Sequence, residues 1–107
     1  MTDQEFSTLA DAALADLNRR LARAADSHDF DSDFNNGTIA IEFDDPPAKF
    51  VVSPNAPVKQ VWVSARVRSF KLDWHEDLQA FALPDGRTLR RLIADVVSEQ
   101  LGEAVTL

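Results

Sequence analysis

The stretch that most constrains the fold is Lys59–Trp74, KQVWVSARVRSFKLDW, in which polar and apolar residues alternate along two successive segments. The first segment has the period of two that is typical of a strand with one buried face. Its inward positions are Val61, Val63 and Ala65, and its outward positions are Gln60, Trp62 and Ser64. In the second segment Trp74 shares parity with Phe70 and Leu72, which predicts that Trp74 is buried. The stretch is therefore predicted to form a β-hairpin with one core face and one wet face, and Trp62 lies on the wet face.

A second hairpin is predicted upstream. Residues 29–34 alternate strictly, which on a strand places three Asp side chains on one face and two Phe on the other. Asn36-Gly37 supplies the two positive-φ residues that a tight hairpin turn requires, and a strand returns over 38–43. Its inward residues are Ile39, Ile41 and Phe43. Apolar runs predict further short strands over 50–52 and around Phe81 and Leu83.

A helix is predicted at each end of the chain. Thr2 and Glu5 match a capping box, and apolar residues then recur every three or four positions as far as Ala25. They are Phe6, Leu9, Ala10, Ala13, Leu14, Leu17, Leu21 and Ala24. The second helix is predicted to begin after Thr88 as N-cap and to end at Gly102. Its inward stripe is Leu89, Leu92, Ile93, Val96, Val97 and Leu101.

The order of these elements predicts an α+β fold. Short turns force neighbouring strands to run antiparallel, and two helices with one apolar stripe each can bury those stripes on one face of the sheet. We therefore expect a two-layer α/β sandwich, with both terminal helices on one face of an antiparallel sheet of about six strands. A chain of 107 residues is long enough for one such domain, which we expect to span 1–107.

The absence of cysteine excludes disulfides, zinc ribbons, cysteine-ligated clusters and thiol nucleophiles, and is compatible with a reducing compartment. The amino terminus, MTDQEF, has neither the basic start nor the apolar run of a signal peptide. No segment approaches the roughly 20 apolar residues of a membrane span. We expect a cytoplasmic protein with no membrane partner.

The net charge of −7 is unevenly distributed along the chain. Residues 1–45 hold 11 acidic and 3 basic residues, whereas 46–107 hold 7 and 8. Such a negative field repels nucleic acid and attracts cations or a basic protein surface. We therefore expect a protein that binds no nucleic acid. We also expect a monomer.

The sequence offers little support for an enzyme. Neither histidine has a sequence partner that would make it a catalytic base, and the GxSxG, P-loop, GxGxxG and HExxH motifs are absent. Paired carboxylates could perform acid–base chemistry, but a small two-layer fold offers little of the closed pocket that shifts their pKa values. We therefore expect a protein without catalytic residues.

Two features could carry a binding function. Asp26, Asp29, Asp31 and Asp33 form an acidic run. Carboxylates at alternate strand positions stand roughly 7 Å apart, which predicts an open and weak cation site. A nearby His28 or His75 would favour a transition metal. Solvation and protection of an edge strand would account for the same acids equally well.

The second feature is Trp62, flanked by Gln60 and Ser64. A large aromatic side chain held in water by a strand is a candidate anchor for a partner protein, although cross-strand packing alone could also explain it. A cluster of arginines crowds the start of the second helix, where the helix dipole disfavours cations and the sequence shows no compensation. These arginines are Arg87, Arg90 and Arg91.

Several of these residues occur in motifs that resemble the frataxin family, and within it the bacterial, CyaY type. The resemblance runs from Asp3 to Gly102. Its motifs are DQEFSTLAD, FNNGTIAIEF, PVKQVWVSA, LDW at residues 72–74 and the DGRTL that precedes the last helix. Frataxins have the helix–sheet–helix sandwich expected above, so the resemblance implies the same fold.

The resemblance also implies a role in iron–sulfur cluster assembly. It implies weak iron binding through an acidic ridge, and docking onto the cysteine desulfurase and the cluster scaffold as a regulator of the desulfurase. The ridge would comprise Asp29, Asp31 and Asp33 on the strand, with Asp3, Asp11 and Asp26 as further acids. Gln60 and Trp62 would belong to the sheet patch used for partners. An iron store or ferroxidase-like activity through iron-driven oligomerisation, and an adaptor with no metal role, are the alternatives.

The first helix departs from the family pattern. Where the acidic ridge of frataxins is usually densest, this chain has Asn18, Arg19, Ala22, Arg23 and Ala25. The resemblance therefore implies a ridge that survives mainly on the strand, with fewer or weaker ions than a fully acidic relative would hold.

Overall fold

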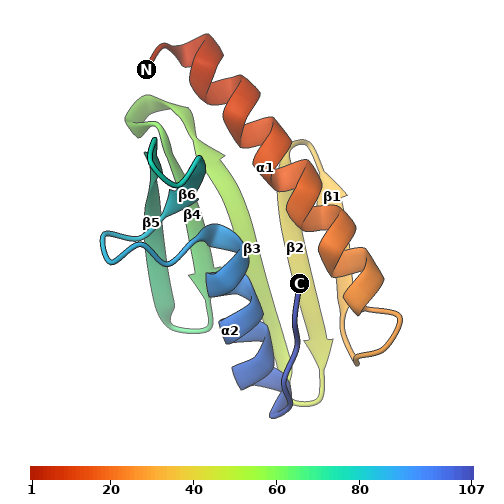
Figure 1. Ribbon diagram of the computed structural model, residues 1–107. Helices are drawn as coiled ribbons and strands as arrows, with labels where there is room; N and C mark the ends of the chain where they lie inside the picture. The colour runs from red at the N-terminus through yellow and green to blue at the C-terminus, as the bar shows by residue number, and fades with distance from the viewer.

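In the computed structural model, which describes residues 1–107, one helix precedes six consecutive strands and a second helix follows them (Figure 1). The first helix is α1, Asp3–Ala24, and the last is α2, Leu89–Leu101. The strands are β1 Asp31–Asn35, β2 Thr38–Asp44, β3 Pro47–Asn55, β4 Gln60–Ala65, β5 Arg68–His75 and β6 Ala80–Ala82, with a 3-10 turn, η1 Ala56–Val58, before β4. No helix is both long and apolar enough to cross a membrane.

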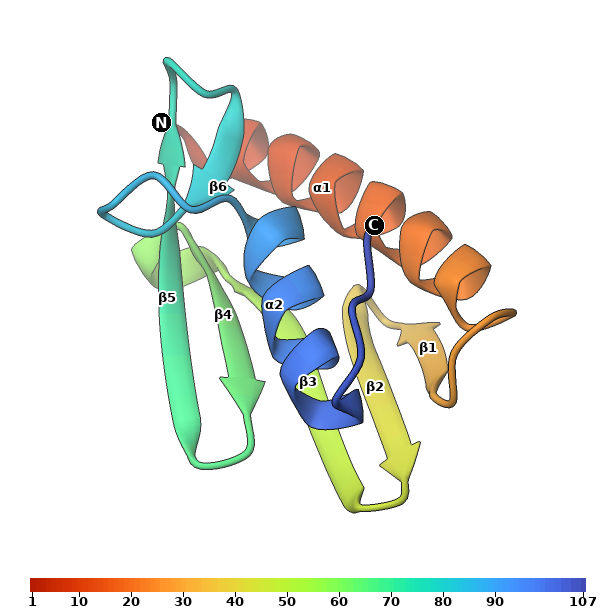
Figure 2. The ribbon, with the colours of Figure 1, turned by 60° about the horizontal axis from the view of Figure 1, so that its bottom comes forward.

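The sheet is a meander in which each strand pairs antiparallel with the next, in the order β1-β2-β3-β4-β5-β6. Both helices cover the same face of this sheet (Figures 1 and 2). The core lies between the two layers, and its largest fully buried side chains include Phe6, Phe50 and Phe81. The opposite face has no covering layer. The α+β, two-layer sandwich expected from the sequence is confirmed.

Capping chemistry fixes the helix ends as the sequence indicates. The Thr2 hydroxyl accepts from the Glu5 backbone N–H at 3.1 Å, and the Glu5 carboxylate accepts from the Thr2 N–H at 3.0 Å. These two bonds satisfy donors that the first helical turn leaves free. The Thr88 hydroxyl caps α2 in the same way by accepting from the Arg91 N–H. Gly102 ends α2 with φ 70°, a conformation that costs little without a Cβ atom.

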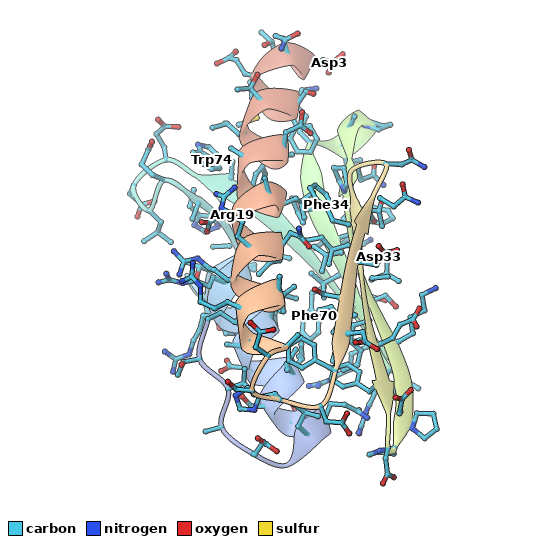
Figure 3. The ribbon with its side chains drawn as sticks, turned by 90° about the vertical axis from the view of Figure 1, so that its right-hand side faces the viewer. Asp3, Arg19, Asp33, Phe34, Phe70 and Trp74 are labelled. Atoms are coloured by element: carbon cyan, nitrogen blue, oxygen red, sulfur yellow. The ribbon has the colours of Figure 1, made fainter.

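Two expectations about the strands are wrong in detail, the start of β1 and the length of β3. Asp29 precedes β1, because the chain is still turning out of α1 and the Phe30 N–H bonds back to the His28 carbonyl. Phe34 faces the helix layer, as its parity predicts, and is 38% exposed because β1 is the edge strand. Figure 3 shows Phe34 and Asp33 on opposite sides of β1. The predicted short strand at 50–52 is the nine-residue β3, because its whole length pairs with β2 and β4.

Trp74 is only half-buried, although its parity predicts burial. One edge of its ring packs on Phe81, with the ring centroids 5.2 Å apart. Its indole Nε1 donates to the Glu76 carboxylate at 2.8 Å. A polar N–H needs such a partner, so the side chain stays at the rim of the core. The last strand, β6, contains Phe81 as expected but ends at Ala82, so Leu83 lies outside it.

Candidate functional site

Trp62 stands on the uncovered face of the sheet, 37% exposed, as its parity predicts. Its Nε1 donates to the Gln60 side-chain oxygen at 3.0 Å, and the Gln60 amide nitrogen donates to Asp73 at 3.1 Å. Lys71, directly opposite on β5, places its Nζ 5.0 Å from the centre of the indole ring. These contacts hold the ring in one orientation through a polar chain and a cation–π contact. The exposed aromatic surface is therefore ordered before any partner arrives.

A shallow hollow of about 190 Å³ lies beside the ring. Small side chains of β3, β4 and β5 form much of its surface, which lets a partner approach the backbone closely. Its lining residues are Val51, Ser53, Trp62, Val63, Ser64, Ser69, Phe70 and Lys71. Ser64 thus shares this surface with Trp62, as predicted. A flat, weakly hollowed surface of this kind suits another macromolecule better than a small molecule.

Asp31 and Asp33 lie on the same uncovered face, at the edge formed by β1. The register places Asp31 opposite Glu42, and Asp33 opposite Ala40. From Ala40 the register continues across the sheet to Val51 and Ser64, so Asp33 and Ser64 are three strand spacings apart, roughly 14 Å. The acidic edge and the Trp62 surface are therefore parts of one continuous face.

The other predicted ligands are dispersed. Asp3 forms an ion pair with Lys59, with Oδ1 and Nζ 3.0 Å apart. Asp11 is exposed on α1, and Asp26 and Asp29 are exposed in the loop before β1. No three Asp, Glu or His side chains are grouped closely enough to hold a metal ion. The six aspartates do not converge on one centre, and any cation bound by them is held by few ligands.

The two histidines do not join the acids into a metal centre either. The Nδ1 atom of His28 lies 2.7 Å from the Glu103 carboxylate, on the segment that follows α2. His75 ends β5. A cation at the β1 edge would therefore meet carboxylates alone, which suit hard ions.

Two of the three arginines at the start of α2 have an acidic partner, contrary to the expectation from the sequence. Arg87 and Arg91 both contact Asp95, at 3.3 and 3.4 Å. On α1, Asp16 accepts from Arg20 at 2.8 Å. This hydrogen bond lowers the pKa of Asp16 below its ordinary value of 3.8. Asp16 and Asp95 therefore each offset two surface arginines.

Three contacts of the predicted residues were missed. Glu42 faces Asp31, Asp73 accepts a hydrogen bond from Gln60, and Lys71 lies over the indole of Trp62. Glu42 could have been found, because the two-residue Asn36-Gly37 turn fixes the register of β1 and β2. Lys71 and Asp73 could not, because no Gly, Asn or Pro marks the turn between β4 and β5.

Comparison with known proteins agrees with this fold. A family model described as a frataxin-like domain matches residues 1–103. The chain belongs to the frataxin-like family. The protein called iron-sulfur cluster assembly protein CyaY in Dechloromonas aromatica is 34% identical to this frataxin-like chain, with alignment over 100% of it and 99% of the relative. The protein of that name in Ralstonia nicotianae is 32% identical, with alignment over 100% of this chain and 95% of the relative.

The frataxin-like fold is also found among solved structures. The frataxin of Psychromonas ingrahamii superposes on this chain with a TM-score of 0.84. The alignment covers 99% of this chain and 97% of that one, at 21% sequence identity. Helices, sheet order and layer arrangement are thus those of a frataxin.

Proposed function

We propose that this frataxin-like protein is an iron–sulfur cluster assembly factor that acts by docking rather than by catalysis. Its partners would be the cysteine desulfurase and the cluster scaffold, and its effect would be to regulate the desulfurase. Relatives aligned over nearly their full length carry the name iron-sulfur cluster assembly protein. The absence of cysteine suits a reducing compartment. We expect the protein to act as a monomer in the cytoplasm.

The observation that carries the proposal is the ordered indole of Trp62 on an uncovered sheet face. An aromatic side chain fixed by Gln60 and Lys71 loses little conformational entropy on binding, so it suits an anchor residue. Asp31 and Asp33 extend the same face with negative charge. A basic partner surface would complement this edge and be steered towards it.

Iron would be cargo at this edge, held by few ligands. Asp31 and Glu42 face each other across the β1–β2 pair, and hard carboxylate oxygens suit ferrous and ferric ions. Lys49 lies 4.0 Å from Glu42 and partly offsets its charge. We therefore expect weak and exchangeable iron binding, in which the metal lies beside the docking face.

Desulfurase turnover, measured with and without this protein and ferrous iron, tests the proposal. Trp62→Ala should weaken desulfurase binding by about 2 kcal/mol or more and reduce the effect on turnover correspondingly. Phe34→Ala is the matched control, because Phe34 has nearly the same exposed fraction but faces the helix layer. It should leave binding unchanged.

Urea unfolding of both variants separates docking from folding. Trp62→Ala should keep nearly the wild-type free energy of unfolding. If it unfolds far more easily, the indole is a packing element and the proposed anchor is wrong. If desulfurase turnover does not respond to the wild-type protein with or without iron, the assembly role itself is contradicted.

A further inference from the structure

The helix layer carries a second charged surface, opposite in sign to the acidic edge. Six of the chain's eleven Lys and Arg residues lie on it. They are Arg19, Arg20 and Arg23 on α1, and Arg87, Arg90 and Arg91 at the start of α2. In a protein with a net charge of −7, this concentration of positive charge is a distinct feature of the surface.

Only two aspartates offset the six arginines. Asp16 contacts Arg19 at 3.5 Å and Arg20 at 2.8 Å, while Asp95 is shared by two arginines of the α2 end. Arg23 and Arg90 form no ion pair, and both are exposed. The surface therefore keeps a net positive charge after its internal pairing. In Figure 3 Arg19 and Trp74 lie on one side of α1, and Asp33 lies on the other.

An apolar hollow of about 430 Å³ adjoins these arginines, between α1, the β5–β6 loop and the start of α2. Nine of its thirteen lining residues are hydrophobic. Leu9, Leu17 and Leu89 contribute from the two helices, and Leu78, which is 43% exposed, contributes from the loop. Arg90 and Asp16 also line the hollow, and Asp16 is already paired with Arg19 and Arg20. The hollow thus combines an apolar lining with a free cation.

The end of the chain, residues 104–107, packs against α2 and is an example of a segment that this part of the helix layer binds. Residues 104–107 follow α2 without regular structure and line a second hollow against it, which shares Thr88 and Arg90 with the first. Val105 is 4% exposed, and its backbone N–H donates to Ser98 Oγ at 2.8 Å. A non-helical segment with one inserted apolar side chain therefore already lies beside the empty hollow.

We propose that the hollow and its arginines form a second docking surface, here called the arginine groove, for an acidic segment of a partner protein. The groove comprises the first hollow together with Arg19, Arg23, Arg90 and Arg91. An apolar side chain of the segment would enter between α1 and Leu78, while its carboxylates would meet Arg90 and Arg19. The net charge of the whole molecule opposes a nucleic acid at this surface, and the apolar lining offers nothing to phosphates. This surface is separate from the Trp62 face.

Amide chemical shifts of the isotope-labelled protein, followed during titration with a short synthetic peptide of Glu and Leu, test the proposal. Shifts should concentrate at Leu17, Leu78 and Arg90. Arg19→Glu/Arg90→Glu should weaken peptide binding roughly tenfold or more, since it replaces attraction by repulsion. Lys49→Glu/Lys71→Glu makes the same charge change on the sheet face and should leave binding within about twofold.

Three further measurements make the test decisive. Leu78→Ser should weaken the peptide without altering any arginine, and a peptide with Lys in place of Glu should not bind the groove. A single-stranded oligonucleotide of equal charge should leave the groove amides unshifted. Equal binding of the Lys peptide, shifts confined to the sheet face, or stronger binding of the oligonucleotide would each overturn the proposal.

Discussion

At the scale of single residues, Gln100 has a particular importance, because it is the buried polar side chain of the core, 4% exposed. Its Oε1 accepts from Arg66 Nε, and its Nε2 donates to the Pro46 carbonyl at 2.9 Å. Gln100 thereby joins α2 to the turn between β2 and β3 and to the turn between β4 and β5. One amide group fixes the helix against the ends of two hairpins.

Gln100→Leu should lower the free energy of unfolding by about 1–3 kcal/mol, because it leaves the Pro46 carbonyl and the Arg66 guanidinium without this partner. Urea unfolding followed by Trp fluorescence measures the loss. Gln4→Leu, on the exposed start of α1, is the control and should change stability by less than about 0.5 kcal/mol. A variant at position 100 as stable as the wild type would show that both groups find water instead.

Residue-scale predictions from sequence succeed where parity alone decides. The alternation in β4 is enough to place Trp62 outside and Val61 inside. Parity does not predict the partial exposure of Trp74, because the indole N–H donates to Glu76 and the ring therefore stays at the rim of the core. The Lys71 contact depends on register, which parity does not determine.

At the scale of elements, the stability that the start of α1 contributes to the fold depends on pH. Hydrogen bonds from the Thr2 backbone and hydroxyl lower the pKa of Glu5 below its ordinary value of 4.5. A carboxylate with a depressed folded-state pKa stabilises the fold at pH values above its unfolded pKa. That contribution is lost as the pH falls below 4.5 and through the folded-state value.

Glu5→Gln should therefore be less stable than the wild type at neutral pH, with a difference that shrinks as the pH falls below about 4.5. Paired urea unfolding series at neutral and acidic pH measure this difference. A constant gap across the series would mean that the carboxylate charge plays no part in the capping box.

The β1–β2 hairpin is the element on which the iron proposal depends. Asp31→Asn/Asp33→Asn should remove most of the amide perturbation that ferrous iron causes along β1 and at Glu42, because too few charged oxygens remain. Asp77→Asn, in the exposed loop before β6, is a control for general loss of charge. An undiminished response in the double variant would place iron elsewhere on the protein.

Element boundaries could be predicted where the local chemistry is strong. The capping residues Thr2, Thr88 and Gly102 set helix ends, and Asn36-Gly37 sets one hairpin. The length of β3 could not be predicted, since Ser53-Pro54-Asn55 has the composition of a turn yet pairs with β4. Tertiary pairing overrides local preference there.

At the scale of the whole molecule, charge is divided between the two layers. Asp31, Asp33 and Glu42 lie on the sheet face, and the arginine groove lies in the helix layer. Summed along the sequence, the net charge gives no indication of this division, because folding brings α1 and α2 together from opposite ends of the chain. The acidic edge was therefore predictable, whereas the basic surface was not.

Association with the desulfurase should slow markedly between low and physiological ionic strength, because salt screens the attraction of the acidic edge for a basic surface. Stopped-flow measurement across a salt series gives the association rate constants. Dissociation should change much less, since the Trp62 contact is largely apolar. Association rate constants that do not change with salt concentration would argue against electrostatic steering by this face.

The meander has a consequence for biosynthesis. Each strand pairs with the one made just before it, so hairpins can close as the polypeptide leaves the ribosome, without waiting for distant segments. The helix α2, however, follows all six strands. The apolar side of the nascent sheet is therefore only half covered, by α1, until α2 emerges. During that interval the growing chain is most exposed to aggregation and to chaperones.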